Sequence, residues 1–400
     1  MKFNKYFMLG LAGLAFAACS NDEDVTNGNE EGKVRVTLSL GRTETRALGP
    51  TAKGVYNTVT DLKIIFYNSA GAYVAHPVSG TINGVDYNNE TAVNKAVEAL
   101  NAGHSATIDL KEIPSSATQM LVVANSKNKT NGVSTQSLDA AKKTTIYLKQ
   151  QVIEEYKTFE GEESRMTGLG QIVTKNGVSS VDVSLKPVPS RIELKDVTAQ
   201  KLPAGVEWGG VDIQSFEVRG FYVNSFYETG FLDATDDPNR ARIDNESDPE
   251  NYTKNAYTTA EWGFMCDEPT EGQMTSQAGT EGSNVIWENI VTDRNNKYFG
   301  YMVIKGIPVD VVIKLNVTFT DGSNADKYLT IRNYKYAPDQ DGYTAGDVVS
   351  TFERGTVYRV NNVPFDVRDL TDVPYEQTTS LTANVEVLPW AGVDVTPGFN

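Results

Sequence analysis

The residues able to do nucleophilic or redox chemistry are few, with two His and two Cys in 400 positions. His76 and His104 each stand in a turn-rich stretch, and neither has a Ser or Cys nearby in a recognisable nucleophile context. Cys266 lies in an aromatic stretch and is expected to be a buried structural thiol. No Gly-rich stretch has the form of a phosphate-binding loop. We therefore expect neither an enzyme nor a cofactor site.

Residues 233–251 form an acidic stretch whose carboxylates could bind calcium. Their spacing matches no known calcium loop, so a solvated loop is the competing interpretation. The carboxylates concerned are Asp236, Asp237, Asp244, Glu246, Asp248 and Glu250.

The charge of the chain limits its partners. Asp and Glu number 52 against 36 Lys and Arg, so the net charge is −16. Such an excess of negative charge repels phosphate backbones, and a nucleic-acid-binding protein is therefore not expected.

Residues 1–18 have the form of an export signal. Lys2 and Lys5 precede an apolar run from 7 to 16, which is too short to span a bilayer as a helix. Small residues then lead into Cys19, which resembles a bacterial lipoprotein signal and predicts lipidation of Cys19. The alternative is an ordinary secretory signal cut near Ala18.

The acidic run Ser20–Asp24 follows Cys19 and resembles the tag that sends lipoproteins to the cell surface in the Bacteroidetes. A solvated linker is the plainer interpretation of the same residues. With the first interpretation, the precursor is an outer-membrane lipoprotein held only by its lipid.

The elements that position these sites are mostly strands. Residues 33–40 alternate between apolar and polar side chains, which predicts a half-buried strand. A polar, turn-rich stretch follows, in which Arg46 and Ala47 would suit an Arg-specific protease. The apolar side chains of the strand are Val34, Val36, Leu38 and Leu40.

Many further short strands separated by turn residues predict a mainly β chain, with a helix over 88–102. Residues 137–157 are predicted to be a helix or a mixed segment. Pro187 and Pro189 interrupt the pattern, and we place a domain boundary at 188–190.

The last strand, at about 381–395, again has one apolar face. Thr382, Asn384 and Glu386 form its polar face, and Pro389 and Trp390 interrupt the alternation before it resumes. The apolar residues are Leu381, Ala383, Val385, Val387, Val393 and Val395.

Taken in this order along the chain, these features resemble the fimbrillin family of the Bacteroidales, and especially its major subunits of short fimbriae. The resemblance also includes Leu121–Asn125, Met166–Gly168, Arg191–Leu194 and Val385–Trp390. It covers most of the chain, and the order of the motifs is more specific than any one of them.

The resemblance implies two transthyretin-like β-sandwich domains, at 47–188 and 189–400, after a signal peptide (1–18) and a propeptide (19–46). It also implies that a protease cuts after Arg46 and removes the strand 33–40. The C-terminal strand of another subunit, expected to be exposed in the uncut monomer, would then fill the vacated groove and build a head-to-tail homopolymer.

Other fimbrial accessory and anchor subunits are the remaining partners that the resemblance implies, with a role in adhesion. Two alternatives stay open. A monomeric surface lipoprotein that binds glycan would keep its N-terminal strand and could use Trp208, Trp262, Trp287 and Trp390. An anchor or accessory subunit would lack either the cleavage site or the donor strand.

Overall fold

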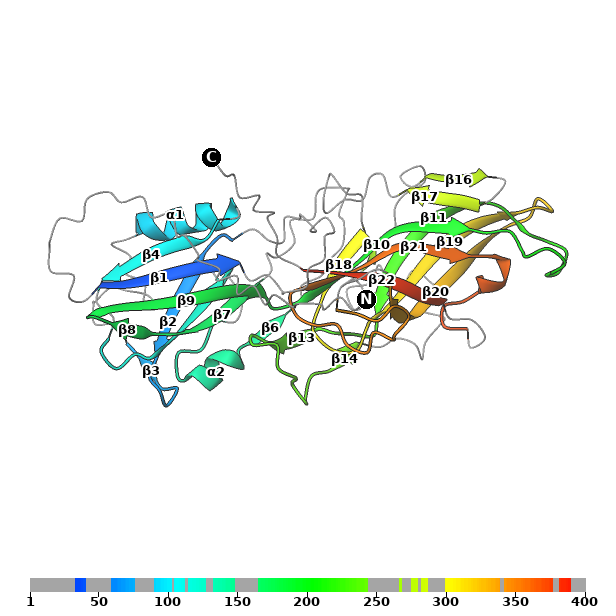
Figure 1. Ribbon diagram of the computed structural model, residues 1–400. Coiled ribbons are helices and arrows are strands. Elements are labelled where there is room, and N and C mark those ends of the chain that lie inside the picture. Colours follow the sequence, from blue (N-terminus) through cyan, green and yellow to red (C-terminus); the bar gives the residue numbers. More distant parts are fainter. Residues whose placement is uncertain are drawn as a thin grey trace, which may run out of the picture.

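The computed structural model describes residues 33–40, 59–75, 90–102, 104–111, 114–126, 132–147, 165–243, 266–267, 275–279, 282–286, 299–338, 342–376 and 381–389. Within them the chain is mainly β, as predicted (Figure 1). Neither helix in the described part is long and apolar enough to cross a membrane.

The first sandwich contains most strands before Pro187, with one helix at its side. Its elements are β1 (Lys33–Leu40), β2 (Leu62–Tyr67), β3 (Tyr73–Val74), α1 (Glu90–Asn101), β4 (Ala106–Lys111), β5 (Gln119–Ala124), β7 (Met166–Gln171), β8 (Val173–Lys175) and β9 (Val178–Pro187). The hydrogen-bonded order is β3-β2-β5-β7-β9-β1-β4, and β8 also pairs with β9.

This order is folded into two layers because β9 passes from one to the other. Along Ser179–Leu185 it pairs with β1, and at Lys186 and Pro187 it pairs with β7. The inward side chains of β1, β4 and β9 then meet those of β2, β5 and β7 in one hydrophobic core. Helix α1 contributes Ala96 and Leu100 to this core, in agreement with the predicted helical period.

The second sandwich contains nearly all the strands after Ser190. They are β10 (Ser190–Ala199), β11 (Ile213–Asn224), β15 (Cys266–Asp267), β16 (Thr275–Gly279), β17 (Gly282–Ile286), β18 (Phe299–Val303), β19 (Asp310–Phe319), β20 (Asn324–Tyr336), β21 (Thr356–Phe365) and β22 (Leu381–Pro389), with a 3-10 turn η4 at Val367–Asp369. The short strands β12 (Phe226–Tyr227) and β14 (Arg242–Ile243) pair with each other in a separate sheet.

In the second sandwich β22 joins the two layers. Its first half pairs parallel with β20, and its second half pairs antiparallel with β21. In the sequence, the alternation of apolar residues over 313–319, followed by Asp321 and Gly322, predicts a hairpin that returns at 328–331. This hairpin is present as β19 and β20, with Gly322 in the left-handed conformation that its turn requires (φ 85°).

Another two-stranded sheet connects the two sandwiches. Helix α2 (Leu138–Lys142), capped by Ser137, leads into β6 (Thr145–Tyr147), which pairs with β13 (Thr229–Phe231). The predicted mixed character of 137–157 is therefore correct over its described part. The hydrophobic core of the second sandwich also continues through Ile146 to the outer face of β2 and β5. The division into the domains 47–188 and 189–400 stays a prediction.

Candidate functional site

The strand predicted to be removable, β1, is an internal strand of its sheet. Lys33–Leu38 pair antiparallel with β4, and Val34–Leu40 pair parallel with β9. Among the described strands, β4 pairs only with β1. We call the space between β4 and β9 that β1 occupies the β1 slot. Without β1, both of its walls would have unpaired backbone groups.

The β1 slot is lined by apolar side chains. Val36 and Leu38 are completely buried, each opposite a buried valine of β9, Val181 and Val183. Burial of one such aliphatic side chain stabilises the fold by about 1.5–3 kcal/mol. Val34 and Leu40 continue the same alternation at the two ends of β1. A replacement strand must therefore offer apolar residues at every second position.

Two glycines allow β7 to lie close to β9, which forms one wall of the slot. A Cβ on Gly168 would lie 2.4 Å from the carbonyl oxygen of Ser184, and one on Gly170 would lie 2.5 Å from a methyl group of Val181. Any other residue would therefore have to displace β9, which forms one wall of the slot. The motif Met166–Gly168 indicated only one of these contacts, and Gly170 was missed although it follows two positions later.

The predicted donor strand is also internal, and this corrects one expectation. Ala383, Val385 and Val387 are 2%, 0% and 3% exposed in the core of their own sandwich, with Leu381 packed at its margin. The expectation that this strand is exposed in the uncut monomer is therefore wrong. The alternation that makes it a suitable donor equally makes it a good strand of its own sheet.

The segment Arg191–Leu194 is part of β10, and its charged residues form a buried cluster. Arg191 Nε lies 2.8 Å from Glu193 Oε1, and Arg359 Nη2 of β21 lies 2.9 Å from Glu193 Oε2. All three side chains are at most 4% exposed. Charges buried in this way are strongly destabilising when one partner is lost. Glu193 thus joins β10 to β21 at side-chain level, beside their backbone pairing.

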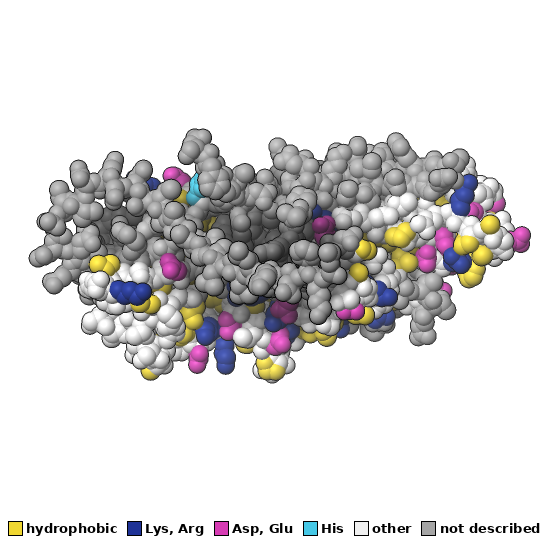
Figure 2. All heavy atoms as spheres, in the orientation of Figure 1, with side chains coloured by type: hydrophobic (Ala, Val, Ile, Leu, Met, Phe, Trp, Pro, Cys, Tyr) yellow, Lys and Arg dark blue, Asp and Glu magenta, His cyan; other side chains and the backbone are white. Residues whose placement is uncertain are grey.

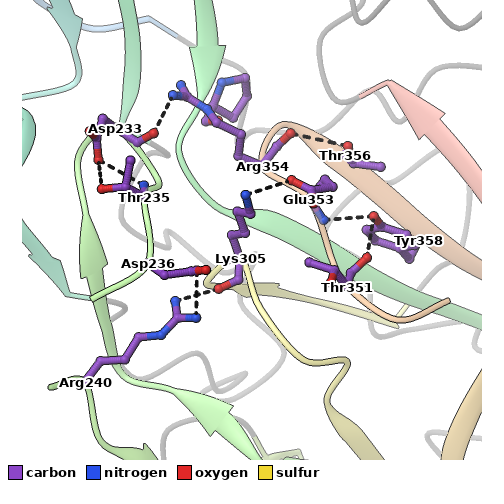
Figure 3. A network of polar contacts seen from close by, with 11 residues as sticks. Asp233, Thr235, Asp236, Arg240, Lys305, Thr351, Glu353, Arg354, Thr356 and Tyr358 are labelled. Carbon is purple, nitrogen blue, oxygen red and sulfur yellow. Dashed lines mark hydrogen bonds and ion pairs between the residues drawn. The ribbon is translucent and has the colours of Figure 1, made fainter. Parts of the chain in front are cut away.

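Arg354 lies in the turn before β21 of the second sandwich, and its side chain forms hydrogen bonds to the first sandwich. Its Nη2 donates to the carbonyl oxygen of Lys186 at 2.8 Å and to Thr167 Oγ1 at 3.0 Å, and its Nε donates to the carbonyl oxygen of Pro187 at 3.2 Å. Its Nη1 reaches the carbonyl oxygen of Asp233 at 3.4 Å (Figure 3). Burial lowers the pKa of Arg354, and the charge of Asp233 opposes this. No sequence signal distinguishes this arginine.

In the described part of the acidic stretch, 233–243, the carboxylates form hydrogen bonds and an ion pair within the protein. Asp233 accepts hydrogen bonds from Thr235, Asp236 pairs with Arg240 at 3.1 Å, and Asp237 accepts from the backbone N–H of Asn239. Arg240 also donates to the carbonyl oxygen of Lys305 at 2.7 Å (Figure 3). Among the described residues, no group of His, Cys, Asp and Glu could hold a metal ion. Asp244, Glu246, Asp248 and Glu250 lie outside them.

Several predicted site residues lie outside the described part of the chain, namely Cys19, Arg46, Ala47, Val393 and Val395. The same holds for His76, whereas His104 is exposed just before β4. Cys266 lies in β15. Of the four tryptophans, Trp208 is described and is 53% exposed.

Comparison with known proteins gives distant structural similarities only. No protein-family model matches the chain, and no curated protein matches its sequence. A candidate cell adhesion protein from Bacteroides eggerthii aligns over 90% of this chain and 96% of its own, with 14% identity and a TM-score of 0.48. One from Parabacteroides distasonis aligns over 90% and 99%, with 13% identity and a TM-score of 0.47.

The fimbrial anchor protein Mfa2 from Porphyromonas gingivalis aligns over 73% of this chain and 83% of its own, with 11% identity and a TM-score of 0.30. Similarities this distant do not establish a shared function. The case for function therefore depends on the strands at the two ends of the described chain.

Proposed function

We propose that this chain is the precursor of a structural, shaft-forming subunit of a cell-surface fimbria, with a role in adhesion and no catalytic activity. In this proposal Cys19 is lipidated and holds the precursor at the outer membrane. An Arg-specific protease then cuts between Arg46 and Ala47. The C-terminal strand of another copy then fills the β1 slot. Accessory and anchor subunits complete the fimbria.

One observation carries the proposal: a strand that precedes a cleavable arginine is an internal strand of a sandwich. Cleavage after Arg46 would separate β1 from the rest of the chain and leave β4 without its strand partner. It would also expose the apolar positions now covered by Val36 and Leu38. A slot with two unpaired edges is a strong acceptor for a strand of another copy.

The strand β22 has the features that the β1 slot requires. Its apolar residues recur at every second position, as in β1, and it pairs in parallel over its first half and antiparallel over its second half, whereas β1 has both kinds of neighbour along the same residues. Leu381, Ala383, Val385 and Val387 correspond in spacing to Val34, Val36, Leu38 and Leu40. Since β22 belongs to its own sheet in the uncut chain, exchange requires its release from β20 and β21. Val393 and Val395 extend the same pattern.

The proposal is tested by blocking the cut. We expect the Arg46→Ala precursor to fold but to form no fibres, because β1 still fills the slot. Arg42→Ala is the matched control and should form fibres, while the double variant excludes cutting at Arg42. N-terminal sequencing of surface protein should give Ala47. Normal fibres from the double variant would refute the proposal.

Hydrogen exchange supplies a second readout, on the cleaved monomer. The amides of β4 should exchange faster after cleavage, because β1 is its strand partner in the described structure. A peptide with the sequence of residues 33–40 should restore protection. The same peptide with Asp in place of Val36 and Leu38 should not, because it would bury two carboxylates.

A monomeric glycan-binding lipoprotein is the second candidate, and the exposed indole of Trp208 is the observation that favours it. Such a protein would keep β1 in place. Surface protein that begins at lipidated Cys19 in bulk would support this candidate and contradict the first.

A further inference from the structure

The β8–β9 hairpin exposes an aliphatic and basic surface at one end of the molecule. Val173 and Val178 are 47% and 37% exposed, and Lys175 is exposed beside them. Because Lys175 pairs with Val178 and Val173 with Ser180, these side chains share one face of the hairpin. We call this surface the hairpin pole.

The hairpin pole lies at the mouth of the β1 slot. The start of β1 is held beside the start of β9, where Val34 is opposite Ser179. At the same end Lys111 terminates β4 opposite Lys33. A strand that replaces β1 in the same direction must therefore enter beside the hairpin pole.

The loop between β10 and β11 forms an aromatic and acidic surface, which we call the loop pole. Val206 and Trp208 are 39% and 53% exposed, with Glu207 exposed between them. Two turns shape the loop, since Val206 donates to the carbonyl oxygen of Pro203 at 3.0 Å and Val211 to that of Trp208 at 3.3 Å.

Acidic side chains surround the exposed apolar residues of the loop pole. The carbonyl oxygen of Asp212 accepts from the backbone N–H of Thr320, which brings the exposed Asp321 of the β19–β20 turn beside the loop. The carboxylates of Glu207, Asp212 and Asp321 outnumber the exposed Lys201, while the nearby Lys327 is paired with Asp372. The loop pole is therefore acidic where the hairpin pole is basic.

The two poles lie at opposite ends of the elongated molecule. The strand β9 runs from the hairpin pole to the junction, and β10 runs from the junction to the loop pole (Figure 1). In Figure 2, hydrophobic and basic side chains meet near the left end, and hydrophobic side chains lie among charged ones at the right end. Contact between unlike ends is heterologous and does not close, so it extends a filament.

We propose that the loop pole of one copy docks on the hairpin pole of the next, and that this contact orients strand exchange. The occupant is a second copy because each pole offers exposed apolar side chains and the charges are complementary. The proposal rests on the proposed fimbrial function and adds the surfaces that select the partner.

The direction of β22 agrees with this docking. Just before β22 the chain is fixed near the loop-pole half of β20, where Thr371 and Tyr328 bond through their backbones and Lys327 pairs with Asp372. A released β22 would therefore leave its subunit on the side of the loop pole. It would enter the neighbouring slot at the hairpin pole and run in the direction of β1.

Cysteine cross-linking tests the contact directly. In a Cys266→Ser background, Lys175→Cys and Glu207→Cys in one chain should cross-link copies into a ladder in assembled fibres. Val348→Cys paired with Lys175→Cys is the control, because Val348 is 63% exposed but lies on the second sandwich away from the loop pole. Fibres that cross-link through Val348 and not through Glu207 would overturn the proposal.

Charge exchange provides an independent test after cleavage. Lys175→Glu and Glu207→Lys should each slow fibre elongation about tenfold, and the double variant should recover most of the rate. Lys143→Glu, at an exposed site at the end of α2, should have little effect. Failure of the double variant to recover would count against the contact.

The variant Trp208→Ala distinguishes a subunit contact at Trp208 from glycan binding by the same residue. We expect it to slow elongation about tenfold while the monomer keeps its melting temperature, since the indole is exposed. Unchanged elongation together with lost glycan binding would overturn the contact and assign Trp208 to a glycan. If the wild-type chain forms no fibres after cleavage, the proposed function itself is wrong. This result is obtained without the pole variants, so it is distinct from a failure of the proposed contact.

Discussion

At the scale of single residues, Gly168 shows how closely the layers of the first sandwich approach. A Cβ there would lie 2.4 Å from a carbonyl oxygen and 2.5 Å from a methyl group of Val183. We expect Gly168→Ala to lower the free energy of unfolding by about 1–3 kcal/mol, measured by denaturant titration. Gly132→Ala is the control, because nothing lies within 4 Å of its added Cβ. Equal stability of the two variants would contradict the close approach.

Buried phenols make a second prediction at this scale. Burial raises the pKa of Tyr67, Tyr334 and Tyr358 above the ordinary value. The unfolded chain loses these protons near pH 10, while the folded chain retains them. Their stabilising contribution is therefore complete below about pH 10 and is lost as the pH rises above it.

The measurement is the free energy of unfolding between pH 9 and 11. The free energy of unfolding should decrease less steeply with rising pH in Tyr334→Phe than in the unchanged chain. The difference in slope should be up to about 1.4 kcal/mol per pH unit, the effect of one proton. The Tyr334 hydroxyl has no hydrogen-bond partner among the described residues, so the variant should keep its stability at pH 7. An unchanged slope would show that Tyr334 ionises in the folded chain as it does when unfolded.

At the scale of elements, β22 stabilises the uncut chain and is proposed to link copies after the cut. Because Val385 and Val387 are buried in their own sandwich, Asp at both positions should destabilise the uncut monomer by at least about 3 kcal/mol. This reverses the expectation from the sequence, in which an exposed strand would tolerate the change. Thermal unfolding of the Arg46→Ala precursor provides the measurement.

Asn384→Asp is the matched control for β22, since Asn384 is exposed on the same strand and the change also adds a carboxylate. It should leave the melting temperature nearly unchanged. If the double Asp variant melts like this control, β22 does not form part of the core in solution.

At the scale of the whole molecule, the junction is held by β6 pairing with β13 and by Arg354. Arg354→Met should remove hydrogen bonds to four carbonyl oxygens, those of Thr167, Lys186, Pro187 and Asp233, and lower stability by about 1–3 kcal/mol. It should also broaden the distribution of interdomain distances in small-angle scattering. Arg219→Met is the control, because Arg219 forms a partly exposed pair with Glu217. Unchanged scattering would mean that Arg354 does not stiffen the junction.

A stiff junction matters for the proposed fibre. The proposed docking joins the ends of successive copies, so each subunit must transmit direction from its hairpin pole to its loop pole. A hinge at Pro187–Pro189 would let neighbouring subunits bend independently, and Arg354 crosses this linker from the second sandwich to Lys186 and Thr167.

The sequence by itself determined the elements. Alternation of apolar residues predicted β1, β19 and β22, and a helical period predicted α1, because side-chain periodicity follows directly from backbone geometry. The turn residues Asp321 and Gly322 predicted the return strand β20. Prolines located the break between β9 and β10, since proline cannot donate to a strand ladder. The scarcity of His and Cys was visible without any structure.

Only the tertiary structure decided which strands are neighbours. Alternation in residues 381–387 predicts that one face of the strand is buried, but it does not predict which core buries this face. The structure shows that it is buried in the chain's own sandwich. The internal position of β1, the approach of Gly168 and Gly170 to β9, and the reach of Arg354 across the junction depend in the same way on contacts between distant segments. Such contacts are set by packing of the whole chain, for which local periodicity has no signal.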